Sequence, residues 1–229
     1  MLFHGYEAQI LDGTWMSIKL SLLSLALAIA FGLLGALCKL SRNPLLYRSA
    51  QCYSTLIRSV PDLVMMLLMF YSLQIGLNHV TDRLALPQID IDPFSAGVVT
   101  IGFIYGAYFT ETFRGAFLAV PRGQIEAGTA YGMSSLLVFR RILFPQMMRF
   151  ALPGLGNNWQ VLVKASALVS IIGLADIIKV TQDAGRSTMQ LFYFSWLAAF
   201  IFLAITTVSS LVLHRLERRY NTGVKESRL

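Results

Sequence analysis

The sequence predicts an all-α integral membrane protein with five membrane-spanning helices in a single domain, residues 1–229. Hydrophobic residues make up 55% of the chain and charged residues 14%, and the mean hydropathy is +0.61. A soluble domain carries about 25% charged residues, and a disordered chain combines low hydrophobicity with high charge. The composition therefore excludes both classes. In addition, apolar stretches of about 20 residues, the length that a spanning helix needs, recur along the chain.

These stretches place the spans at about 15–38, 58–78, 94–117, 154–175 and 191–213. The segment before the first span is acidic. This favours a retained helix over a secretory signal peptide, whose leading region is basic. The second span is interrupted by Pro61, and the fourth by Lys164, Gly154 and Gly156.

The connections between the spans differ in charge. Fourteen of the 19 Lys and Arg residues fall on one side: Lys39, Arg42, Arg48, Arg58, Arg114, Arg122, Arg140, Arg141, Arg149, Arg215, Arg218, Arg219, Lys225 and Arg228. Only three fall on the other side. The positive-inside rule then predicts an external N-terminus and a cytoplasmic C-terminus. Topology explains the net charge of +7, so we expect no nucleic acid as a partner.

The chain lacks the usual motifs of catalysis. It contains no HExxH, no GxSxG and no Gly-rich phosphate loop. Cys38 and Cys52 both fall on the predicted cytoplasmic side, where disulfides are rare, and two cysteines do not make a zinc site. We therefore interpret them as packing residues and predict no catalytic or metal-binding residue. Energy for any uphill transport must come from a partner or an ion gradient.

A long connection, 118–153, lies on the predicted cytoplasmic side and carries structure of its own. Pro121 favours the start of a helix, and Gly132 favours its end because glycine adopts the left-handed conformation there. A second helix, capped by Ser134 or Ser135, should run to a break or kink at Pro145. The pattern predicts a short helix, a sharp turn and an amphipathic helix at the membrane surface. The small residues Ala127, Gly128 and Ala130 would let another protein approach the short helix; the alternative is a plain interfacial loop.

The run GQIEAGTAYGMSSLLVFRRILFP (123–145) resembles the "EAA" loop of bacterial ABC importer permeases. That pattern has Glu-Ala-Ala, a Gly after three more residues and an Ile-x-Leu-Pro ending. Here Glu126, Ala127, Gly128 and Gly132 occupy the first part, with Gly128 in place of the second Ala; the end has Phe144 in place of the last Leu. The resemblance extends to LIRSVPDLVMMLLMFY, GAYFTETFRGA and ALPGLGNNWQVLVKASALVS, at 56–71, 106–116 and 151–170. Within this family, the chain is similar to the polar amino acid permeases, above all those of the histidine and lysine/arginine/ornithine system.

The resemblance implies a type I ABC importer permease: five transmembrane helices and a cytoplasmic coupling-helix loop in a bacterial inner membrane. It implies partners as well: a second permease (a copy or a related chain), two ATPase subunits and a periplasmic binding protein, besides membrane lipid. ATP and Mg would be bound by the ATPase, so no cofactor is expected in this chain. The resemblance assigns ATPase docking to Glu126, Ala127, Gly128 and Gly132. The substrate would be a polar, in particular a basic, amino acid, moved by alternating access.

Several polar residues fall inside the spans, where ionisable groups usually face protein or a water-filled cavity. Glu111 and Lys164 lie at similar depths at 1.5 Å rise per residue, so they could form a static pair or line the substrate pathway. Asp62 is a pathway candidate that Arg58 could neutralise, as Arg114 could neutralise Glu111. Tyr105 and Tyr108 carry hydroxyls that need partners. Asn157, with Asn158, either caps the fourth span or contributes to a polar gate.

Gly102 and Gly106 form a GxxxG pattern on the third span, which permits close helix packing. Outside the importer family, the main alternative is an ion-coupled secondary transporter or channel for small polar solutes. Such a protein would need no docking loop, and five spans are few for a transporter built from repeats. A membrane enzyme is a third alternative, and it lacks a nucleophile or metal constellation.

Overall fold

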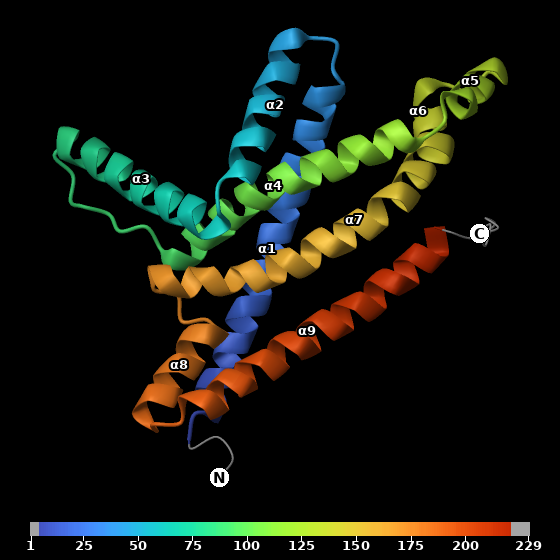
Figure 1. Cartoon of the computed structure of the whole chain (residues 1–229). Coiled ribbons are helices and arrows are strands. Elements are labelled where there is room, and N and C mark those ends of the chain that lie inside the picture. Colours follow the sequence, from blue (N-terminus) through green and yellow to red (C-terminus); the bar gives the residue numbers. More distant parts are fainter. Residues whose placement is uncertain (1–4, 221–229) are drawn as a thin grey trace.

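The computed structural model describes residues 5–220, and within this range every regular element is a helix (Figure 1). The elements are α1 (Glu7–Leu40), α2 (Pro44–Ser59), α3 (Asp62–Arg83), α4 (Pro93–Ala119), α5 (Arg122–Ala130), α6 (Ser135–Val138), a π-helical turn (Phe139–Leu143), α7 (Phe144–Ala165), a 3₁₀ segment (Ser166–Ile172), α8 (Ile177–Ser187) and α9 (Leu191–Tyr220). The predicted all-α class is confirmed. Lys225 and Arg228, assigned above to the cytoplasmic side, lie outside the described residues.

Four of the helices are long and apolar enough to cross a membrane: α1, α3, α4 and α9. A fifth candidate span is broken. It runs from Ser135 to Ile172 and continues, after a bend of 56°, as α8. By length and composition, the described residues thus provide four candidate spans, or five if the bent pair crosses the membrane as one span.

The core of the fold is the crossing of α1 and α4, where glycines let the two helices approach closely (Figure 1). A Cβ added at Gly102 would lie 2.7 Å from Cβ of Leu27, and one at Gly106 would lie 2.6 Å from Cβ of Phe31. A Cβ added at Gly32 on α1 would likewise clash with Cβ of Phe109 on α4. The GxxxG pattern therefore serves packing between helices of this chain.

The connection between the predicted first and second spans forms the amphipathic helix α2. The side chain of Asn43 accepts a hydrogen bond from the Leu45 backbone N–H at 2.9 Å, and Pro44 occupies the first turn. Both are common signals of a helix start. The predicted start of the second span at about residue 58 is therefore too early, because Arg58 lies in the last turn of α2 and α3 starts after Pro61.

Of the two alternatives predicted at Pro145, a break and a kink, the break is wrong. Pro145 lies in the first turn of α7, directly after the π-helical turn, and the helical path continues. π-helix is rare, and it occurs mostly as a single turn within a longer helix, as it does here. As a result α7 starts at Phe144, about ten residues before the predicted fourth span, and also contains Pro153.

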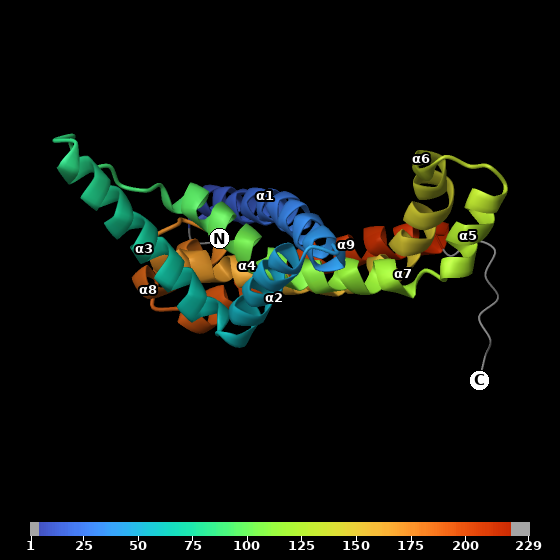
Figure 2. The same cartoon turned by 90° about the horizontal axis from the view of Figure 1, so that it is seen from above.

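The remaining helices are arranged loosely around this core. α3 extends away from the other helices, and α9 runs beside α7 (Figures 1 and 2). Only 6% of the apolar window of either helix is buried within the chain. The start of the chain joins the α8–α9 corner, where Tyr6 forms a hydrogen bond with Ser187 at 2.5 Å and an edge-on ring contact with Phe194.

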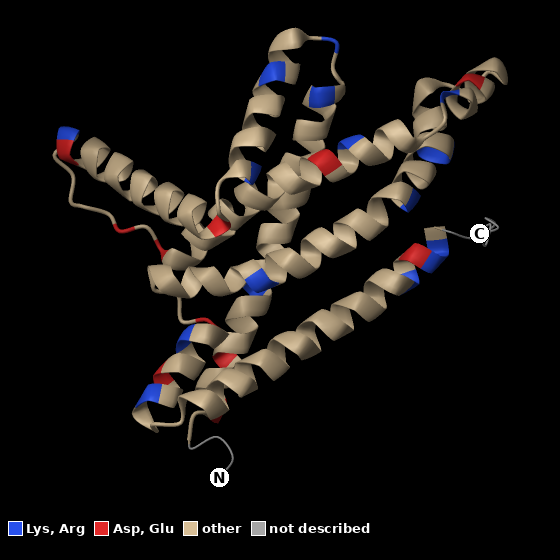
Figure 3. Ribbon diagram, in the orientation of Figure 1, with Lys and Arg blue, Asp and Glu red and all other residues tan. Residues whose placement is uncertain are grey.

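Charged residues are distributed unevenly (Figure 3). Basic residues gather at the α1–α2 turn, near the start of α7 and at the end of α9. Acidic and basic residues mix around α8 and at the end of α3, and the connection before α4 carries acidic residues. Cys38 and Cys52 are free thiols. Cys52 is exposed, so the interpretation of both cysteines as packing residues is wrong for this one.

Candidate functional site

The connection between α4 and α7 holds the first candidate site, a short helix that ends in a tight turn. α5 ends with two hydrogen bonds, from the Met133 N–H to the Gly128 carbonyl at 3.1 Å and from the Gly132 N–H to the Thr129 carbonyl at 3.0 Å. This pair defines a Schellman motif. Gly132 has a φ of +77°, as the turn prediction requires. Ser134 stands at the N-cap position of α6, but its side chain makes no capping hydrogen bond.

The two sides of α5 differ in exposure. Glu126, Ala127 and Gly132 are exposed, and Tyr131 beside them is 88% exposed. Gly128 is buried instead, and a Cβ there would lie 2.5 Å from Cδ1 of Ile142. Its small size therefore serves packing inside the loop rather than the approach of another protein. The outward side of α5 is a free surface in this chain.

A second cluster lies where α2 gives way to α3, against α4. The carboxylate of Asp62 accepts hydrogen bonds from the hydroxyls of Tyr105 at 2.8 Å and Tyr108 at 3.5 Å. The two rings stack at 5.4 Å between centroids. Arg58 lies over the Tyr108 ring at 5.5 Å. The i,i+4 spacing led us to expect Arg58 and Asp62 as neighbours on one helix. They lie on different helices instead, because α2 ends before Pro61 and α3 begins after it.

A third cluster joins α1, α2 and α4 through Lys39, whose side chain is 1% exposed. Its ammonium donates to Gln51 at 2.8 Å, to Ser54 at 2.6 Å and to the carboxylate of Glu111. Arg114 donates to the other oxygen of Glu111 at 3.0 Å. All three donors of the ammonium are thus used, and Glu111 is shared between two cations.

Of the two alternatives for Glu111 and Lys164, the static pair is therefore wrong. Lys164 is exposed, and the described residues offer it no ion pair. Asn157 and Asn158 do not cap a span either, because α7 already extends more than three turns before them. Asn158 instead donates to Thr112 at 3.0 Å, which joins α7 to α4.

Sequence reasoning missed Lys39 as the partner of Glu111, because the predicted first span ends at residue 38. A signal was present nonetheless. Gly32, Gly35 and Ala36 precede Lys39 at helical spacing, so the four residues share one face of α1. All four are buried in this face. A lysine that continues a face of small residues is expected to point toward the neighbouring helix.

Apolar candidate spans that carry an exposed short helix on a fixed turn agree with the permease fold that the resemblance implies. The chain belongs to the family of binding-protein-dependent transport system inner membrane components, whose model matches residues 28–222. The resemblance noted in the sequence is thereby confirmed.

Individual relatives agree. The chain is 58% identical over 228 residues to the histidine/lysine/arginine/ornithine transport system permease protein HisQ of Salmonella typhimurium, with both chains covered completely. It is 33% identical to the arginine ABC transporter permease protein ArtQ of Haemophilus influenzae, over 98% of this chain and all of that one. A chain in the crystal structure of an amino acid ABC transporter with histidines superposes with a TM-score of 0.77 at 31% identity, covering 93% of this chain and 95% of that chain.

Proposed function

We propose that this chain is the permease subunit of an ATP-driven importer for basic amino acids: histidine, lysine, arginine or ornithine. The substrate class follows from the names of the relatives described above. The proposed complex contains a second permease, two ATPase subunits and a periplasmic binding protein. ATP and Mg are bound by the ATPase subunits, and this chain contributes the route through the inner membrane.

The observation that carries the energy-coupling part of this proposal is the exposed side of α5. A helix of nine residues held by a Schellman turn, with Glu126, Ala127 and Tyr131 outward, offers a rigid surface to a partner. Its inner side is packed through Gly128 against Ile142, in the π-helical turn that leads into α7. A movement of the partner would therefore be transmitted through α5 and this turn to the spans.

The substrate route is proposed to run along the open face of α7. Asn157 and Lys164 are seven residues apart, with Val161 between them, and all three are exposed. Residues at this spacing share one helix face. A second permease facing this stripe would enclose a polar passage, because ionisable groups in spans usually face such cavities. Asp62, with Tyr105 and Tyr108, is a further candidate to line it, whereas Glu111 is already held by two cations.

The orientation belongs to the same proposal, with the N-terminus periplasmic and the C-terminus cytoplasmic. The charge distribution supports it. In a variant without Cys38 and Cys52, single cysteines at Gln88 and Asp183 should react with an impermeant thiol reagent on intact cells, and one at Gln124 should not. Labelling of the cysteine at Gln124 alone would contradict this orientation and indicate the opposite one.

Transport by the reconstituted complex tests the proposed function. Proteoliposomes that contain the permeases and ATPase subunits, supplied with the binding protein, should accumulate radiolabelled arginine or histidine only when ATP reaches the ATPase side. Collapse of ion gradients by ionophores should leave the rate unchanged. Uptake that continues without ATP and stops with ionophores would favour the ion-coupled alternative instead.

A further inference from the structure

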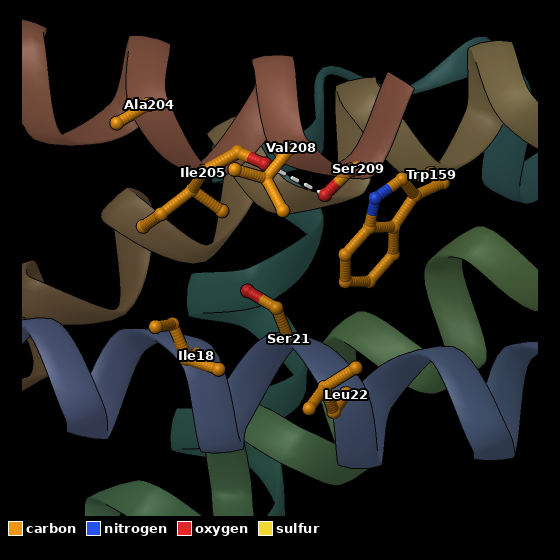
Figure 4. Close-up of a pocket in the computed structure, with 8 residues that line it drawn as sticks. All are labelled: Ile18, Ser21, Leu22, Trp159, Ala204, Ile205, Val208 and Ser209. Atoms are coloured by element: carbon orange, nitrogen blue, oxygen red, sulfur yellow. Dashed lines mark hydrogen bonds between the residues drawn. The ribbon is translucent and has the colours of Figure 1, made fainter. Parts of the chain in front are cut away.

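An apolar groove lies between α1 and α9, with α7 and Phe109 of α4 as its floor. α9 packs on α7, where Gln160 donates to Ser210 at 3.0 Å. α1 and α9 meet at their starts, through Ile10 and Phe194, and diverge from there along the groove (Figure 1). Two adjoining cavities, of about 370 and 390 Å³, share the lining residues Leu22, Trp159, Val208 and Ser209. Figure 4 shows the indole of Trp159 between α1 and α9, with Val208 and Ser209 facing α1. The cavities therefore form one continuous groove.

The chemistry of the groove favours a hydrocarbon chain as its occupant. The two hydroxyls that line it are already satisfied within their own helices, because Ser21 donates to the Ser17 carbonyl at 2.8 Å and Ser209 to the Ile205 carbonyl at 2.7 Å. The other side chains that line it are apolar, apart from the single N–H of Trp159. A polar substrate would lose its hydrogen bonds to water here without replacement, whereas an acyl chain loses nothing.

The charge at one end of the groove indicates which lipid. Val212 and Leu216 line this end on α9, and Arg219 follows them at helical spacing on the same face. Arg149 precedes Leu152, another lining residue, by one turn of α7. Basic residues at the membrane-surface end of a pocket between spans are a recognised mode of anionic headgroup binding. Figure 3 shows basic residues at the corresponding ends of both helices.

We propose that this groove binds one anionic phospholipid, with an acyl chain between α1, α7 and α9 and its phosphate between Arg149 and Arg219. The lipid would fill the space that separates α9 from α1 and so hold α9 in place against α7. This site is distinct from the substrate route, since Asn157 and Lys164 lie on a different face of α7 from Leu152, Leu155 and Trp159.

Photocrosslinking in the reconstituted whole complex tests the proposal. The probe is phosphatidylglycerol with a diazirine on one acyl chain, present in both leaflets, and phosphatidylcholine with the same chain is the comparison. Mass spectrometry should locate adducts on peptides that carry Trp159 and Val208. Phosphatidylglycerol should give several-fold more of them than phosphatidylcholine. Arg149→Gln and Arg219→Gln should each reduce this preference about fivefold, while Arg186→Gln on α8 leaves it unchanged.

A second pair of variants tests the groove itself. Ser209→Trp fills it without removing a bond between helices, so groove adducts should fall severalfold; Leu203→Trp, on the exposed opposite face of α9, should not reduce them. Equal labelling of both faces of α9, or equal labelling by the two lipids, would overturn the proposal. The absence of lipid adducts in the groove would overturn it too, because a protein partner would then cover the groove. If Ser209→Trp does not assemble, the arginine variants decide alone.

Discussion

Lys39 carries a buried charge, and Glu111, whose side chain is 22% exposed, supplies its counter-charge. Each is paired, and both lie where α1, α2 and α4 meet. A lone charge within the hydrocarbon region costs roughly 2.5–3.5 kcal/mol on insertion scales. The pair avoids this cost, and the hydrogen bonds of Lys39 to Gln51 and Ser54 fix α2 against the core as well. We therefore assign the cluster a structural role in holding three helices together.

Removal of one partner should be more harmful than removal of both. Glu111→Gln leaves the buried Lys39 ammonium without a counter-charge, which should destabilise the complex by roughly 3–5 kcal/mol. The double variant Lys39→Met/Glu111→Gln should recover most of this loss. The loss in the single variant and its recovery in the double variant are measured by heating the purified complex and monitoring its unfolding by size-exclusion chromatography.

Lys164→Met is the matched control, because Lys164 has no ion pair in the described part of the chain. It should unfold at the temperature of the unmodified complex. A double variant no more stable than Glu111→Gln alone would contradict the structural role of the pair.

At the scale of elements, α5 depends on one backbone conformation. Gly132 adopts a φ of +77°, and its N–H and that of Met133 close the end of the helix. A β-branched residue there costs about 1–2 kcal/mol or more. The turn would open, and the outward side of α5 would lose its fixed position relative to α7.

Gly132→Val should therefore uncouple ATP hydrolysis from uptake or detach the ATPase, while the spans still insert. Gly123→Val is the control, since Gly123 lies in the same helix, has no positive φ, and nothing lies within 4 Å of an added Cβ. The ratio of substrate taken up to ATP hydrolysed in proteoliposomes should fall only for Gly132→Val. Normal coupling in that variant would argue strongly against docking through α5.

The elements of this chain differ in how well local pattern predicts them. Long charge-free stretches fix α1, α4 and α9, and turn residues fix α5, because these signals lie within the segment itself. α2 was missed because its few charges resemble those of a cytoplasmic loop, although Asn43 and Pro44 mark its start. Pro145 misled the prediction because a π turn, which no composition rule reveals, keeps the helix continuous.

The candidate sites also differ in whether a signal within the local sequence predicts them. The exposed turn at Gly132 could be predicted because glycine there has a local backbone reason. The partner of Glu111 could not be deduced from depth alone, since Lys39 and Lys164 are both available and only the packing of α1 on α4 selects between them. The contacts of Arg58 with the Tyr108 ring and of Asp62 with Tyr105 likewise depend on the end of α2 and the start of α3 between them. The i,i+4 spacing of Arg58 and Asp62 does not predict this change of helix.

At the scale of the whole molecule, the isolated chain is incomplete. α3 and α9 bury only 6% of their apolar windows, and α7 leaves Asn157 and Lys164 exposed. A continuous apolar helix facing lipid is ordinary, but exposed polar residues in a span are costly. These surfaces are consistent with the proposed second permease across α7, the proposed ATPase on α5 and lipid around the rest.

The central claim is that this chain acts only as part of an ATP-driven complex. Native mass spectrometry of the complex, purified from membranes by a tag on this chain, measures this most directly. We expect one particle that contains this chain, a second permease chain and two copies of a P-loop ATPase. Particles of this chain alone, or with copies of itself but no ATPase, that still catalyse uptake after reconstitution would contradict the account.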